Sequence, residues 1–161
     1  MKRFLTASII SCCAVAHSAS LADSKKVFSS GSWSVLRGTD SMTDKATCTG
    51  VYKKDYSKQL SADTLYISIR GGISSVTMRF DDEPPRGLRL ATETEKGIDA
   101  ITVNEAEFDK LLQSSRLRMR VSTLVSGIQD FDIDLRGLND AVENIRSGCP
   151  EKSQPAGKKN G

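Results

Sequence analysis

The stretch RLRMRVSTLVSGIQDFDIDL, residues 116–135, is the most regular segment of the sequence, because charged and apolar side chains alternate along both of its halves. Arginines hold the charged positions of the first half, and aspartates hold those of the second. The apolar positions are Leu117, Met119, Val121, Phe131, Ile133 and Leu135. A period of two is typical of a strand with one buried face. The two halves therefore predict an antiparallel hairpin whose loop centres on Val125.

One register of this hairpin sets all three arginines opposite all three aspartates. Its outer-face pairs are Arg116 with Asp134, Arg118 with Asp132, and Arg120 with Asp130. The same register sets Leu117 opposite Ile133 on the inner face, and a slip by one residue would turn charges into the core. A row of arginines can bind carboxylates or phosphates. Because each arginine here already faces a carboxylate, the sequence favours a solvated structural charge ladder over a ligand site.

Upstream of the hairpin, short strand signals alternate with turn residues, as in antiparallel β proteins. Strands are expected within residues 33–36, 46–54, 64–70, 73–80, 88–92 and 98–103. Gly71 and Gly72 predict a tight hairpin turn between two of these strands, because glycine readily adopts positive φ. Pro84 and Pro85 predict a turn in residues 81–87, because each proline removes a backbone donor.

Two short helices are predicted beside these strands. Asn104 followed by Glu107 is a capping-box arrangement, and the second helix is expected to end at Gly148 before Pro150. Their apolar stripes are Phe108, Leu111 and Leu112 in one, and Leu138, Ala141, Val142 and Ile145 in the other. The predicted fold class is mainly β (α+β): an antiparallel β-sandwich or barrel-like sheet with two short helices.

The chain begins with a predicted signal peptide, residues 1–22. Lys2 and Arg3 precede an apolar run over residues 4–16, and Ala22 ends a small-residue cleavage site. This run is shorter than the roughly 20 residues of a spanning helix, so we expect a periplasmic or secreted protein without a membrane span. Processing before Cys12, which would give a lipoprotein, is the alternative. A flexible leader (23–30), a single β-rich domain (31–150) and a disordered tail (151–161) are expected to follow.

Two cysteines, Cys48 and Cys149, remain after removal of the signal peptide. In an oxidising compartment an even number of cysteines predicts a disulfide. This one would close a loop of about 100 residues, which the chain-entropy model values at roughly 4–5 kcal/mol. Two buried free thiols are the alternative.

The composition excludes several classes of function. The single histidine, His17, lies in the signal peptide, so the mature protein has no His-dependent triad and a poor set of zinc ligands. The 23 basic residues nearly balance the 20 acidic ones, which argues against a nucleic-acid partner. Two prolines follow the acidic run 81–83 directly and cut it short, so this run is expected to be a turn rather than a calcium loop. We predict no cofactor, no metal and no catalytic residue, while the sequence leaves any small-molecule ligand undefined.

A resemblance covers most of the mature chain, residues 33–149. It is carried by Trp33-Ser34-Val35, Ser41-Met42-Thr43-Asp44, Val76-Thr77-Met78-Arg79-Phe80-Asp81, Phe108 with Leu111-Leu112, and Phe131-Asp132-Ile133-Asp134-Leu135-Arg136-Gly137-Leu138, followed by Ala141, Ile145-Arg146 and Cys149. In this order the segments resemble the VasI/TagO-like periplasmic accessory proteins of type VI secretion clusters. The architecture is also similar to the invasion-associated locus B family. The resemblance implies an envelope protein that acts by contact and has no catalytic residues.

These observations predict a secreted periplasmic, non-enzymatic binding or accessory protein of the bacterial envelope, linked to secretion or host interaction. Its expected partner is another envelope protein. An inhibitor or immunity protein that blocks an envelope enzyme is the alternative, and a hydrolase that uses two carboxylates is a third hypothesis.

Overall fold

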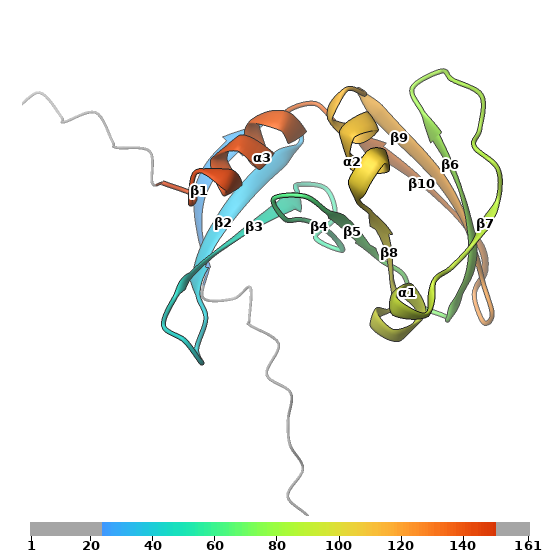
Figure 1. Cartoon of the computed structure of the whole chain (residues 1–161), viewed down its shortest axis with the longest axis horizontal. Coiled ribbons are helices and arrows are strands. Elements are labelled where there is room, and N and C mark those ends of the chain that lie inside the picture. Colours follow the sequence, from blue (N-terminus) through green and yellow to red (C-terminus); the bar gives the residue numbers. More distant parts are fainter. Residues whose placement is uncertain (1–23, 151–161) are drawn as a thin grey trace, which may run out of the picture.

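Residues 24–150 of the computed structural model form two antiparallel sheets and three helices (Figure 1). The larger sheet has the order β1 (Lys25–Ser30), β2 (Trp33–Thr39), β3 (Ala46–Tyr52), β4 (Lys58–Leu60), β5 (Leu65–Ser68), β8 (Ala100–Val103). The smaller has the order β10 (Gly127–Asp134), β9 (Arg116–Thr123), β6 (Ile73–Phe80), β7 (Arg89–Leu90). The helices are α1 (Glu93–Ile98), α2 (Glu105–Leu112) and α3 (Leu138–Arg146). The β-rich α+β class is thus confirmed, as two separate sheets. The predicted signal peptide and tail lie outside the described residues.

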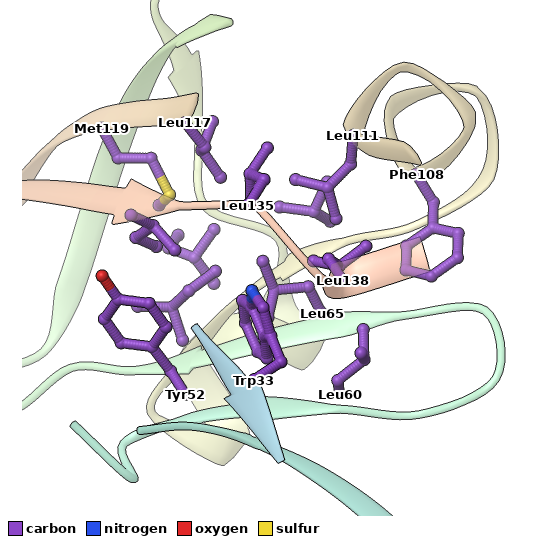
Figure 2. Close-up of a cluster of buried hydrophobic side chains, with 14 of the residues drawn as sticks. Trp33, Tyr52, Leu60, Leu65, Phe108, Leu111, Leu117, Met119, Leu135 and Leu138 are labelled. Carbon is purple, nitrogen blue, oxygen red and sulfur yellow. The ribbon is translucent and has the colours of Figure 1, made fainter. Parts of the chain in front are cut away.

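The hydrophobic core lies between the two sheets and is closed by α2 and α3 (Figure 2). Trp33 is fully buried at its centre and packs on Tyr52, with the ring centroids 5.3 Å apart. The buried face of β9 and the alternate residues of β6 meet it from the other sheet. The period-two pattern of the sequence therefore faces the core as predicted.

The hairpin of β9 and β10 has the predicted register. Arg118 lies opposite Asp132, Arg116 opposite Asp134, and Arg120 opposite Asp130. The inner-face partners, Leu117 with Ile133 and Met119 with Phe131, are also as predicted. The register follows from the apolar matches, because a slip by one residue would bury the charges.

The predicted hairpin turn at Gly71 and Gly72 is wrong. Both glycines have positive φ, +105° and +69°, but β5 pairs with β4 and β8, whereas β6 pairs with β7 and β9. The chain therefore crosses between sheets here. A Cβ atom at Gly71 would lie 2.6 Å from Oγ of Ser126, so the close approach of the β9–β10 loop also requires a glycine.

Three helices replace the two that the sequence predicts. The added helix, α1, begins at Glu93. Its N-cap is Thr92, which forms a capping box, because Thr92 and Glu95 each hydrogen-bond the backbone of the other. Asn104 precedes α2 as predicted but makes no side-chain capping bond. Helix α3 ends at Ser147, and Gly148 follows with φ +82°, as predicted.

The predicted flexible leader is also wrong for the part that the structure describes. Residues 25–30 form strand β1, which pairs with β2 through an irregularity between Lys26 and Phe28. The Ser- and Lys-rich composition hides this strand, because only Val27 and Phe28 turn toward the core cluster.

A disulfide joins Cys48 of β3 to Cys149, just past α3, with 5.9 Å between the Cα atoms. Helix α3 packs on β1, β2 and β3 (Figure 1). The bond predicted from the sequence therefore fixes the last helix to the larger sheet.

Candidate functional site

The outer face of the four-stranded sheet carries the predicted charge ladder. Because Leu117, Met119 and Val121 of β9 point into the core, the residues between them point outward. We call this surface the ladder face, and its polar residues are Thr77, Arg79, Arg116, Arg118, Arg120, Asp130, Asp132 and Asp134.

The side-chain partners on the ladder face differ from the predicted ones, although the backbone register is right. Only Arg120 and Asp130 form the predicted pair, a two-pronged contact of 2.8 and 2.9 Å. Arg116 pairs diagonally with Asp132, at 2.7 Å from its Nε. Long arginine side chains reach diagonal positions, and strand twist brings one diagonal closer.

The two remaining members of the ladder bind outside it. Arg118 donates to the carbonyl of Asp81 and to the carboxylate of Asp82. Asp134 accepts hydrogen bonds from Arg136 and from Ser32. The predicted pairs of Arg118 with Asp132 and of Arg116 with Asp134 are therefore opposite in register but are not ion pairs.

The aspartates of the ladder remain charged well below neutral pH. Hydrogen bonds from Arg120 and Arg116 lower the pKa of Asp130 and of Asp132, respectively. The hydrogen bond from Arg136 holds the pKa of Asp134 far below its usual range. Because these pairs face water, they contribute little to stability. Their consequence is a fixed pattern of opposite charges on an exposed sheet.

A groove of about 490 Å³ lies on the ladder face over β6, β9 and β10. Arg79 and Arg118 are cross-strand neighbours in it, and Pro85 forms part of its wall. The buried Nε atoms of both arginines have no hydrogen-bond partner among the described residues. Because these Nε atoms are buried and Arg120 binds both oxygens of Asp130, the groove is polar but presents mostly paired charges.

Aliphatic side chains are exposed at the hairpin end of the same sheet. Leu124, Val125 and Ile128 are 81, 85 and 67% exposed. Leu90 of β7 is also exposed, and together with Leu124 it lines a second depression. We call these four residues the apolar tip. The apolar tip was not predicted from the sequence, although Val125 and Ile128 are apolar residues in and beside a predicted loop.

The acidic run 81–83 is a structural turn, as predicted. The carboxylate of Asp81 accepts hydrogen bonds from the backbone of Ser115 and Arg116, and Glu83 pairs with Lys110. Within residues 24–150, no three His, Cys, Asp or Glu side chains gather as a metal site would require. The helices of that same part of the chain are all too short or too polar to cross a membrane.

A second polar cluster, which the sequence did not predict, surrounds Glu95 of α1. This side chain is only 1% exposed and binds both terminal nitrogens of Arg89 at 2.8 Å. It also accepts hydrogen bonds from the backbone N–H groups of Thr92 and Thr102, each at 2.9 Å. Burial raises the pKa of Glu95, but these hydrogen bonds outweigh it and lower the pKa to about 2. The cluster fixes α1 and β7 to the edge of β8.

Comparisons with known proteins show a shared fold and no family. No family model and no curated protein matches the chain. The crystal structure of invasion associated protein B from Bartonella henselae is similar, with a TM-score of 0.50 and 13% sequence identity. The match covers 77% of this chain and 95% of that chain. It supports the likeness to the invasion-associated locus B architecture, whereas the VasI/TagO-like resemblance finds no support in these comparisons.

Proposed function

We propose that the protein is a non-enzymatic binding protein of the bacterial envelope, secreted to the periplasm or beyond, which contacts another envelope protein through the ladder face and the apolar tip. One observation carries this proposal: the fixed charges and the groove of the ladder face adjoin exposed aliphatic residues at the hairpin end of the same small sheet. The four tip residues are the part of this surface that water solvates least favourably.

The chemistry of this surface suits a protein partner. Protein interfaces combine arginine with apolar side chains at their centre and place polar groups around them. The disulfide of Cys48 and Cys149 and the paired strands hold the surface in one shape, so binding orders few new groups. A disulfide also suits an oxidising compartment. Links to secretion and to host interaction remain part of the proposal. The second link draws on the fold shared with a protein whose name associates it with invasion.

Site-specific photocrosslinking in the native cell tests the proposal. A photoreactive residue at Val125 should give a discrete adduct with an envelope protein. The matched control is Met42, which is 90% exposed in the β2–β3 loop of the other sheet. Equal adducts from both positions, or none from Val125, would refute the ladder face as the contact surface. An adduct with an enzyme that the purified protein inhibits would favour the alternative, an inhibitor or immunity protein.

Intact mass of the protein from cells tests the proposed location. A mature chain that begins at Asp23 and is recovered from the periplasm or the medium would support secretion. A lipid-modified Cys12 would replace this with a membrane-anchored protein.

A further inference from the structure

The edge strands of the two sheets differ in how their free backbone groups are covered. An edge strand leaves alternate N–H and C=O groups unpaired, and soluble proteins block such edges with bulges, charges, short strands or covering segments. In the part of the chain that the structure describes, the edge strands are β1 and β8 of the larger sheet and β7 and β10 of the smaller one.

Three of these edges are covered, short or irregular. On β8, the outward N–H of Thr102 donates to Glu95, and its C=O accepts from Arg89. Strand β7 has two residues, too few to template another strand. Strand β1 is interrupted between Lys26 and Phe28, and such an irregularity breaks the regular spacing of edge groups.

The edge of β10 is closed at one end only. The N–H of Asp134 donates to the hydroxyl of Tyr52, and its C=O accepts from Nε1 of Trp33. Both groups of Asp134 therefore point away from β9. Since the direction alternates with period two along a strand, the N–H and C=O groups of Ile128, Asp130 and Asp132 also point outward. No residue between 24 and 150 hydrogen-bonds these six groups.

We propose that this open edge, residues 128–132, accepts an extended basic segment of a partner protein as a fifth strand of the small sheet. Strand addition is a common mode of peptide recognition, in which backbone hydrogen bonds give affinity and alternate side chains give specificity. The proposal rests on the proposed function and names the chemistry of the partner.

Charge selects a basic segment. Strand β10 contains three aspartates and no basic residue, and Asp130 and Asp132 are exposed on its outer face. Lys54 of the β3–β4 loop already acts on Asp132, so the selection rests mainly on Asp130. Side chains of an added strand would lie about 5 Å from these aspartates, whereas the arginines of β9 would lie two strands away, at about 10 Å. A segment with Lys or Arg at alternate positions would therefore continue the alternation of charge across the sheet.

A second copy of the chain is a poor occupant of the same edge. Two β10 strands paired antiparallel around Asp130 would set Asp130 opposite Asp130, or Asp130 opposite Asp132. Like charges directly opposite each other are destabilising in a sheet. The aspartates therefore act against self-association and in favour of a basic partner.

Binding of a designed peptide tests the proposal with the purified mature protein. The probe is fluorescein-labelled TKVKVKT, and the acidic peptide TEVEVET is its control. The basic peptide should bind saturably and at least tenfold more tightly than the acidic one. Asp130→Lys should weaken it at least tenfold, whereas the same charge change in Asp82→Lys, outside the edge, should alter its Kd by twofold or less.

Two further measurements separate strand addition from charge attraction alone. Asp130→Pro removes an outward N–H group that β9 does not use, so it should weaken the peptide at least fivefold more than Asp130→Asn does. In the unaltered protein, the peptide should slow hydrogen exchange at the amides of Ile128, Asp130 and Asp132, while the odd-numbered amides of β10 are already protected by β9. This second measurement needs no variant that must fold.

The outcomes distinguish this inference from the proposed function. Protection at other strands, equal binding of both peptides, or equal effects of Asp130→Pro and Asp130→Asn would overturn strand addition. If Val125 still crosslinks an envelope protein in cells, the proposed function stands without it. Self-association through β10, seen as a concentration-dependent mass with the same amide protection, would overturn the charge argument.

Discussion

Replacing Glu95 by glutamine should destabilise the protein far more than its single-atom change suggests. Both carboxylate oxygens of Glu95 accept hydrogen bonds, from Arg89 and from the backbone of Thr92 and Thr102. Glutamine keeps one oxygen and brings an NH₂ group to the place of the other. One buried backbone N–H then meets a donor, and Arg89 loses its counter-charge.

Two independent estimates give the size of the effect. The pKa of Glu95 falls from a usual value of 4.5 to about 2, and a shift of this size corresponds to about 3 kcal/mol of stability at neutral pH. Removing one partner of a buried pair typically costs about 3–5 kcal/mol. Because Arg89 is 33% exposed, water compensates part of its loss, and we expect about 3 kcal/mol.

Urea unfolding of the wild type, Glu95→Gln and Glu93→Gln at pH 7 measures this effect. Glu93 lies on the same helix but is 90% exposed and pairs with Lys96 at the surface, so its variant should change stability by about 0.5 kcal/mol or less. Since the pKa of Glu95 is lowered on folding, its contribution is full above about pH 4.5 and is lost as the pH falls toward 2. The difference between wild type and Glu95→Gln should therefore shrink over this range. Equal stability of the two glutamine variants, or a difference that grows in acid, would refute the assigned role of Glu95.

Four other variants test the fold. Met119→Asp should prevent folding or cost more than about 4 kcal/mol in thermal melts, because it buries an unpaired charge. Arg118→Ser should cost about 1 kcal/mol or less in the same measurement. The reverse order would mean that the inner and outer faces of β9 are misassigned. Replacing Cys48 and Cys149 together by serine should cost roughly 4 kcal/mol in urea unfolding, and an unchanged midpoint would show that the bond does not form. Gly97→Ala should stabilise by about 0.5–1 kcal/mol, since a Cβ atom at this helical position meets nothing within 4 Å; a lower melting temperature would contradict this.

The parts of the fold that were predicted correctly depend on local pattern. The β9–β10 hairpin follows from strict alternation over residues 116–135, because the pleat ties sequence parity to a face of the sheet. Helices α2 and α3 follow from stripes of apolar residues at helical spacing. Gly71 and Gly72 show that a local pattern does not determine which strands pair. Their positive φ values were predictable, but whether the next strand returns to the same sheet depends on contacts made much later in the chain.

The candidate site was predictable in position but not in its pairing. The alternation placed the six charged residues of the ladder on one face, and the register set them opposite one another. Side chains as long as arginine then choose among several carboxylates, so Arg118 binds Asp82 and Arg116 binds Asp132. These choices depend on strand twist and on the β6–β7 turn. The apolar tip was not predicted because Leu124 and Val125 lie in a loop, where period-two alternation does not indicate which side chains are exposed.

The buried Glu95 and the open edge of β10 are two outcomes of one physical rule. Outward backbone groups of an edge strand must be satisfied by water, by another strand or by side chains. On β8, side chains take the place of water at the outward groups of Thr102, and this requires a buried carboxylate with a lowered pKa. On β10, the side chains of Tyr52 and Trp33 bond the outward groups of Asp134, and the outward backbone groups of residues 128–132 stay available for another strand. The different treatment of the two edges supports the proposal that a partner meets the small sheet.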